Sequence, residues 1–260
     1  MAASSFSDQM GRTISIECPP QRIISLVPSQ TELLAELGLA ESVVGITKFC
    51  VHPEGWLQRK TIVGGTKKFQ FETIQALNPD LIIGNKEENY REGIEALSRL
   101  YPVWMSDINV LQDALAMISS VGKITSTPQE SNKIIDVIRS KFATIKKYNG
   151  QTVLYLIWKE PWMSVGCDTF IHHLVTLLGL RNVTGNRNRY PVLSENEISL
   201  LAPEYIFLSS EPFPFRQKHI EEIQKISPRS KILLVDGEMF SWYGSRLMKA
   251  PNYFNTLQLD

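Results

Sequence analysis

Hydrophobic and polar positions along the chain form two kinds of segment that alternate. Short apolar runs rich in β-branched residues predict buried strands, and stretches with apolar residues at helical spacing predict helices. Strands are expected at 22–27, 43–46, 81–83, 103–105, 152–158, 205–208 and 231–235, and helices at 29–38, 71–77, 88–100, 110–121, 168–178 and 217–226. This alternation predicts doubly wound α/β lobes with parallel sheets covered by helices. Ser29 with Glu32, and Ser194 with Glu197, have the spacing of a capping box, which predicts that a helix begins at each of these places.

One segment near the middle of the chain breaks the alternation. Thr127, Pro128 and Glu130 occupy the N-cap, N1 and N3 positions of a helix start, and apolar residues follow at helical spacing as far as Ile145. The pattern predicts a helix of about 22 residues, roughly 33 Å long. The expected organisation is an N-terminal α/β lobe at 1–124, a long interlobe backbone helix at 125–149 and a C-terminal α/β lobe at 150–260.

The two predicted lobes repeat one pattern. Phe71–Asn85 reads FETIQALNPDLIIGN and Asn196–Ser210 reads NEISLLAPEYIFLSS, and each contains a short helix, a proline, an acid and an apolar strand. Glu87 and Glu211 follow these stretches at the same offset as the two prolines, 124 positions. A chance likeness between two α/β segments is the alternative. Ligands of such sheets bind beyond the carboxyl ends of the strands, so we expect a ligand cleft between the lobes.

Charge, cysteine content and hydropathy exclude several classes of protein. The chain has 27 Lys and Arg and 27 Asp and Glu, a balance that disfavours binding to nucleic acid. The three cysteines do not form a disulfide framework. The N-terminus shows neither the charged region nor the apolar region of a signal peptide. A cytoplasmic protein and a protein numbered after a removed signal both remain open.

The chain contains no recognised catalytic motif. We find no nucleophile elbow, zinc-protease motif or phosphate-binding loop, so no catalytic residues and no metal ligands are predicted. Cys50 and His52 are interpreted as ordinary loop residues, and the adjacent His172 and His173 point about 100° apart on a helix. An enzyme that carries a metal cluster is the alternative, but it would need several converging cysteines.

Large aromatic residues near strand ends are the most informative candidates for binding. Rings in surface loops suit a large, partly apolar ligand with a polar rim. The candidate rings are Phe49, Trp158, Trp162, Tyr190 and Trp242. Glu87, with Glu88 as its rival, and Glu211 are candidates for docking arginines of a partner protein. The alternative is that these acids only stabilise the N-termini of helices.

Five stretches carry a family resemblance that covers nearly the whole chain in the right order, from about residue 12 to the end. They are RIISLVPSQTELL at 22–34, VVGITKFCVHP at 43–53, ETIQALNPDLIIGNKEEN at 72–89, PWMSVGCDTFIHHLVTLLGLRNVTG at 161–185 and DGEMFSWYGSR at 236–246. They resemble the periplasmic cobalamin-binding and ferric-siderophore-binding proteins of ATP-binding-cassette (ABC) importers, and the cobalamin-binding branch most.

The resemblance implies a monomeric receptor with two lobes on one long backbone helix, without catalytic activity or an intrinsic cofactor. Its ligand would be cobalamin, a ferric siderophore or haem, its partner an importer permease, and its location the periplasm or cell envelope. The residues carried over to the ligand cleft are Phe49, Lys67, Trp158, Trp162, Tyr190 and Trp242, and those carried over to docking are Glu87 or Glu88 and Glu211. The missing signal peptide departs from the family and leaves a cytoplasmic cofactor-binding protein or sensor as an alternative.

Overall fold

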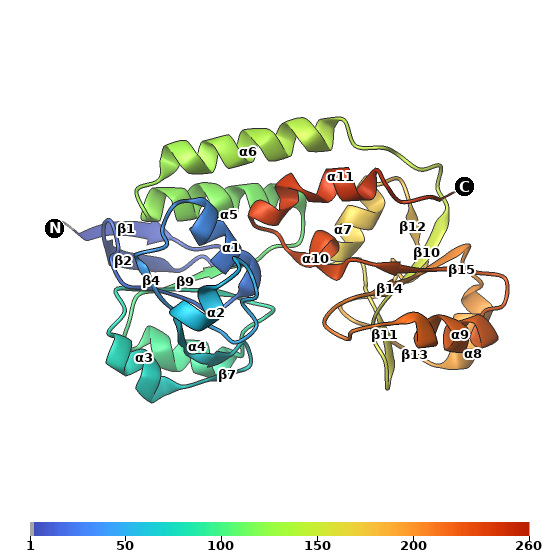
Figure 1. Cartoon of the computed structure of the whole chain (residues 1–260), viewed down its shortest axis with the longest axis horizontal. Coiled ribbons are helices and arrows are strands. Elements are labelled where there is room, and N and C mark those ends of the chain that lie inside the picture. Colours follow the sequence, from blue (N-terminus) through green and yellow to red (C-terminus); the bar gives the residue numbers. More distant parts are fainter. Residues whose placement is uncertain (1–2, 260) are drawn as a thin grey trace. The chain divides into compact units, whose positions relative to one another are not determined.

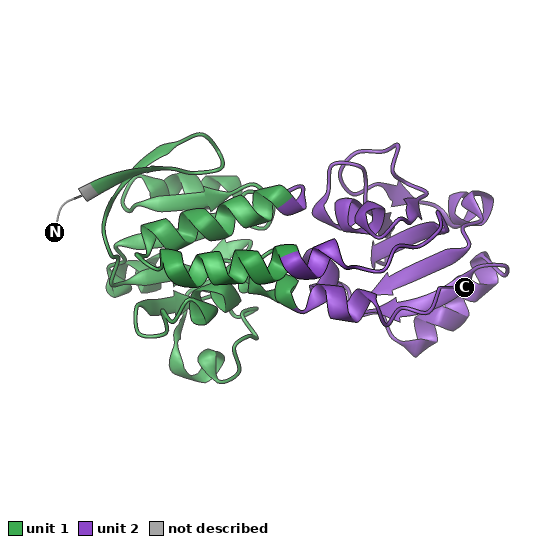
Figure 2. Cartoon of the chain, turned by 90° about the horizontal axis from the view of Figure 1, so that it is seen from above, with its two compact units in different colours: residues 1–108, 112–139, 243–248 green, residues 109–111, 140–242, 249–260 purple. Residues whose placement is uncertain are grey.

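The computed structural model describes residues 3–259 and divides into two compact units (Figure 2). Unit 1 comprises residues 1–108, 112–139 and 243–248, and unit 2 comprises residues 109–111, 140–242 and 249–260. The return of residues 243–248 to unit 1 is not indicated by any pattern in the sequence. No helix within residues 3–259 combines the length and the apolar character that a membrane span requires.

Unit 1 is built on a parallel sheet with the strand order β5-β4-β3-β8-β9 (Figure 1). Its strands are β3 (Ile23–Ser25), β4 (Val43–Ile46), β5 (Thr61–Ile62), β8 (Leu81–Asn85) and β9 (Val103–Ser106). Every residue of β3, β8 and β9 is buried. This explains why these strands appear in the sequence as continuous apolar runs, as strands covered on both faces do.

Helices and two short hairpins complete the first half of the chain. The helices are α1 (Pro28–Glu36), α2 (Trp56–Arg59), α3 (Phe71–Leu77), α4 (Arg91–Ser98), α5 (Leu111–Ile124) and α6 (Pro128–Ala143). The hairpins pair β1 (Ala3–Ser7) with β2 (Thr13–Glu17), and β6 (Gly64–Gly65) with β7 (Lys68–Phe69). Neither hairpin was predicted, because each is too short or too polar to give an apolar run.

The start of α1 differs from the capping box that its sequence suggests. The helix begins at Pro28, with Val27 as an N-cap that makes no side-chain hydrogen bond. Glu32, expected to reach back to the helix start, forms an ion pair with Arg246 at 2.9 Å. The prediction of a capping box here was therefore wrong, because a tertiary partner competes for the carboxylate.

The long helix expected at 127–148 is shorter in the structure. It begins at Pro128 and ends at Ala143. The segment after it stays buried at Ile145 and Tyr148, and the backbone N–H of Tyr148 bonds to the carbonyl of Leu178 rather than within a helix. The apolar spacing beyond residue 143 thus reflects burial of an extended segment in unit 2.

Unit 2 contains a mixed sheet with the strand order β13-β11-β10-β14-β15, and β12 pairs with β10. The strands are β10 (Thr152–Trp158), β11 (Trp162–Ser164), β12 (Arg181–Asn182), β13 (Val192–Leu193), β14 (Tyr205–Ser209) and β15 (Lys231–Val235). Strands β10, β12, β14 and β15 are parallel, whereas β11 and β13 form an antiparallel extension. The three long parallel strands confirm the predictions, and the antiparallel extension was missed.

The helices of the second half are short. They are α7 (Phe170–Leu177), α8 (Glu195–Leu201), α9 (Gln217–Ile226), α10 (Gly237–Ser241), the 3₁₀ helix η1 (Ser245–Met248) and α11 (Ala250–Phe254). The capping box predicted before α8 is confirmed: Ser194 accepts from the backbone N–H of Glu197, and Glu197 accepts from that of Ser194. The carboxylate of Glu197 also pairs with Arg187, but through Oε1, whereas Oε2 accepts from Ser194, so the ion pair and the capping box coexist.

The internal repeat is confirmed at the level of single residues. Helices α3 and α8 begin at 71 and 195 and end at 77 and 201, and strands β8 and β14 begin at 81 and 205 and end at 85 and 209, so each bound differs by 124. Asn78 and Ala202, the helix C-caps, are both left-handed, with φ of 42° and 40°. Asp80 accepts the backbone N–H groups just before β3, and Glu204 accepts that of Thr152 at the start of β10.

Residues 243–248, here called the returning segment, attach to unit 1 by buried contacts. The Arg246–Glu32 ion pair has side chains only 7% and 11% exposed. Tyr243 donates to Glu88 at 2.7 Å. A Cβ on Gly244 would lie 2.5 Å from the carbonyl oxygen of Ser29, so only glycine permits this approach to α1. Unit 1 is therefore completed by residues from near the C-terminus.

Candidate ligand-binding surfaces

A buried polar network fixes the loops at the carboxyl ends of the unit 1 strands. Gln30 and Asn85 both donate to the hydroxyl of Ser106, at 2.6 and 3.0 Å. Asn89 accepts from the backbone of Asn85 and donates to the carbonyl of Thr66. Buried hydrogen bonds of this kind rigidify their surroundings, although Oε1 of Gln30 has no hydrogen-bond partner among residues 3–259. Sequence reasoning missed this network, although polar residues at the ends of apolar strands were a visible signal.

The structure brings Phe49, Lys67 and Glu87 to this edge of unit 1. Phe49 is 50% exposed, and its ring lies over Gly65, where a Cβ would approach it to 3.1 Å. Lys67, in the turn between β6 and β7, donates its ammonium to the carbonyl oxygen of Glu87 at 2.6 Å. An exposed ring and a positioned cation therefore lie on one surface.

Glu87 and Glu88 come after β8 in a turn held by Asn85. The side-chain oxygen of Asn85 accepts from both of their backbone N–H groups, at 2.8 and 3.1 Å. Glu88 also accepts from Tyr243. Burial, together with the nearby charge of Glu88, raises the pKa of Tyr243 well above its usual value, so Tyr243 is a neutral hydrogen-bond donor. Tyr243 is one of the aromatic residues that follow β15, and it lies in one of the stretches that carry the resemblance, but its bond to Glu88 was not predicted.

The structure separates the two tryptophans that flank residues 159–161. Trp158, at the end of β10, is 39% exposed and meets Phe213 edge-on at 5.7 Å between ring centroids. Trp162 is only 6% exposed and stacks parallel to Phe215 at 6.2 Å within the unit 2 core. Trp162 is buried because it lies on β11, a strand that the sequence did not reveal. Of the two, Trp158 has the ring surface that a ligand could reach.

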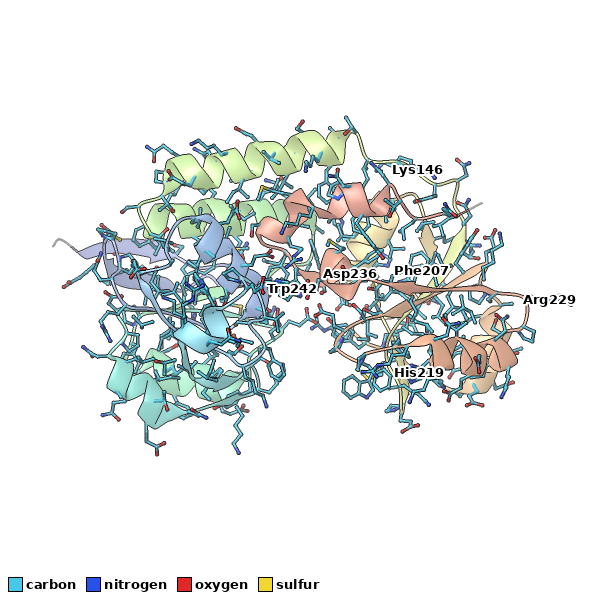
Figure 3. The ribbon with its side chains drawn as sticks, viewed as in Figure 1. Lys146, Phe207, His219, Arg229, Asp236 and Trp242 are labelled. Carbon is cyan, nitrogen blue, oxygen red and sulfur yellow. The ribbon has the colours of Figure 1, made fainter. Side chains whose placement is uncertain are left out.

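Trp242 and Glu211 are bound to each other within unit 2 (Figure 3 labels Trp242). The indole N–H donates to Oε1 of Glu211 at 2.8 Å, and Ser241 donates to the same oxygen at 2.7 Å. Trp242 is 6% exposed. Burial raises the pKa of Glu211, although these two hydrogen bonds act in the opposite direction. Tyr190 is half-buried, and the guanidinium of Arg189 lies 5.6 Å from its ring centroid.

The possible metal ligands Cys50 and His52 do not form part of a metal site. Cys50 is fully buried, and its sulfur lies 3.1 Å from the hydroxyl of Thr31 and 3.2 Å from that of Thr47. Burial raises the pKa of this thiol and keeps it neutral. Within residues 3–259, no group of three or more His, Cys, Asp or Glu side chains is arranged to hold a metal ion.

Each of the two α/β units has loop side chains at the carboxyl ends of its parallel strands, which is where ligands of such sheets bind. This arrangement is typical of two-unit solute-binding proteins. A family model described as "Periplasmic binding protein" matches residues 23–227. The chain belongs to this family of binding proteins, which is the family that its sequence resembles.

Individual relatives and solved structures agree with this assignment. A vitamin B12-binding protein of Vibrio campbellii is 26% identical over 74% of this chain and 71% of its own length. The uncharacterized ABC transporter substrate-binding lipoprotein YvrC of Bacillus subtilis is 22% identical over 76% of this chain and 67% of its own length. The catecholate-siderophore-binding protein VctP of Vibrio cholerae shares the fold with a TM-score of 0.81, at 13% identity over 98% of this chain and all of its own.

Proposed function

We propose that this protein is the solute receptor of an ABC importer in the cell envelope and that its solute is a cobalamin, haem or ferric siderophore. The observation that carries the proposal is the pair of exposed rings at strand ends, Phe49 in unit 1 and Trp158 in unit 2. Flat aromatic surfaces that remain exposed beside rigid loops suit large chelates with apolar faces. The names of the relatives supply the three solute classes.

The proposed role is reversible binding without covalent change. Phe49, Trp158 and Tyr190 would cover apolar faces of the solute, and Lys67 would orient its polar rim. Trp162 and Trp242 are given no direct contact with the solute, since each is packed or hydrogen-bonded within unit 2. The predicted cleft between the two halves stays a prediction.

Binding is tested by titrating the purified protein with cyanocobalamin, haem and a ferric siderophore while tryptophan fluorescence is recorded. We expect saturable quenching by at least one solute. The Phe49→Ala and Trp158→Ala variants should each weaken it by about tenfold, the scale of one lost aromatic contact. Leu200→Ala is the control, because Leu200 is an exposed apolar side chain on α8. Dissociation constants above about 1 mM for all three solutes would refute the proposal.

Docking to the permease is proposed for Glu87 or Glu88 and for Glu211. Two donors orient one oxygen of Glu211, and a carboxylate in a fixed orientation is suited to a bidentate arginine. Glu87→Ala and Glu211→Ala should reduce uptake of the solute by whole cells while its affinity for the purified receptor stays the same. Undiminished uptake in the double variant would exclude these acids from docking.

A further inference from the structure

Two lysines lie near Gly65 on the part of unit 1 that exposes the ring of Phe49. The ammonium of Lys48 lies 5.1 Å from the centroid of that ring. A Cβ on Gly65 would come within 3.1 Å of the ring and 3.6 Å of the Lys48 side chain. Lys67 is exposed in the turn that directly follows Gly65. One positive charge therefore borders the ring of Phe49, and a second lies two residues along the chain from the glycine that the ring contacts.

Two carboxylates close in sequence to this surface, those of Glu88 and Asp107, are engaged elsewhere. Lys86 forms an ion pair with Asp107 at 2.6 Å, and Glu88 accepts from Tyr243. The contacts of Lys67 and Lys48 with the rest of residues 3–259 include the carbonyl of Glu87 and the ring of Phe49, but no ion pair. Their charges are therefore available to a bound anion, whereas the charge of Lys86 is already balanced.

Two candidate rings of unit 2 also have a cation beside them, but each of these two cations has an acidic partner. Arg189, over the ring of Tyr190, lies 3.9 Å from Asp168. Lys159, whose ammonium is 5.8 Å from the Trp162 ring centroid, pairs with Glu222 at 2.8 Å. The charges beside these two rings are therefore balanced within unit 2, unlike the charges of Lys48 and Lys67.

We propose that Lys48 and Lys67 select an anionic chelate, a solute with negatively charged groups at the rim of a flat apolar face, over neutral or cationic chelates. Haem carries carboxylates and ferric tris-catecholates carry net negative charge, whereas cobalamins and ferric hydroxamates do not have such negative charge. Paired ammonium groups attract such anions and speed their association. The inference rests on the proposed function, because it concerns the solute of the same surface.

The test compares two ferric chelates of similar size, a tris-catecholate with net negative charge and a trihydroxamate without it. Wild-type protein should bind the tris-catecholate at least about tenfold more tightly. Lys48→Glu and Lys67→Glu should each weaken that binding by about tenfold and leave the trihydroxamate unaffected or bound more tightly. Raising the salt concentration should reduce the difference between the chelates, since exposed charges are screened.

Two further variants keep the result interpretable. Lys133→Glu makes the same charge change on the exposed face of α6 and should alter neither affinity. Lys67→Met keeps the side-chain stem and should reproduce part of the loss, even if the charge reversal disturbs folding. Equal affinity for both chelates, or unchanged affinity in Lys67→Met when Phe49→Ala weakens binding, would overturn the inference and leave the proposed function standing. Failure of both ferric chelates to bind would overturn the inference, and failure of cyanocobalamin and haem as well would overturn the proposed function.

Discussion

Unit 1 and unit 2 share a helix, a left-handed C-cap and a strand at matching positions, but the loops after the two strands differ. After β8, Asn85 holds a turn through its side-chain oxygen and belongs to a network of buried amides and hydroxyls. After β14, the chain leads to Phe213 and Phe215, which pack with Trp158, Trp162 and His219. One skeleton therefore supports a polar loop edge in one unit and an aromatic edge in the other.

This difference between the loops after β8 and β14 indicates that the repeat preserves backbone geometry, whereas the side chains of the loops vary. Asp80 and Glu204 keep the same task, capping the start of the neighbouring parallel strand. Asn85 and Ser209 are also 124 positions apart, and the side chain of each forms a hydrogen bond with the backbone of the glutamate two residues further on. Beyond that point the units have diverged, and unit 1 alone recruits the returning segment.

The largest effect on stability is expected from removing the buried ion pair that unit 1 forms with the returning segment and that unit 2 does not share. Arg246→Met leaves Glu32 buried without its partner and should lower the free energy of unfolding by about 3–5 kcal/mol. Urea unfolding, followed by circular dichroism, measures the loss. The control is Arg91→Met, which disrupts the exposed Arg91–Glu95 pair of the same unit and should change stability far less, because solvent screens exposed charges. Equal effects would mean that the returning segment contributes little to unit 1.

A smaller effect on stability is expected at Glu211, the acid that comes after β14. The raised pKa of Glu211 means that its contribution to stability is present below the pKa of an unfolded glutamate and is lost as the pH rises through its folded pKa. Glu211→Gln mimics the protonated acid, so the variant should match wild type near pH 4 and exceed it by roughly 0.5–1 kcal/mol at pH 7. Thermal unfolding across this pH range tests the expectation. A variant that is less stable at pH 7 would show that the hydrogen bonds to Ser241 and Trp242 need the charge.

The smallest effect is expected at the two helix C-caps. Ala202 bears the steric cost of a left-handed backbone, which glycine avoids, so Ala202→Gly should stabilise unit 2 by about 0.5–1 kcal/mol. Asn78 tolerates this conformation better, so Asn78→Gly should change stability by less than about 0.5 kcal/mol. Urea midpoints of the two variants, measured side by side, decide the matter. An equal gain at both positions would contradict the steric argument.

Local signals in the sequence predicted the elements of both units, and tertiary contacts account for what was missed. Strands β4, β10 and β15 and helices α3 and α9 have the predicted bounds, because apolar runs and turn residues specify them locally. The end of α6 was predicted too late because burial at Ile145 and Tyr148 mimics helical spacing.

The candidate site was predictable only in part, for the same reason. Aromatic residues near strand ends could be read from the sequence, but their exposure depends on neighbours distant in the chain. Trp158 and Phe49 keep exposed rings. Trp162 is buried on a strand whose partner was not predicted, and Trp242 is buried and hydrogen-bonded to Glu211. The hydrogen bond between Tyr243 and Glu88 was overlooked because the two residues are 155 positions apart in the chain.

The returning segment has a consequence for biosynthesis. As the chain emerges from the ribosome, Glu32 is made 214 residues before Arg246. Unit 1 is therefore begun early but cannot be completed until its returning segment has been made, and the nascent chain must tolerate a carboxylate without its guanidinium until then.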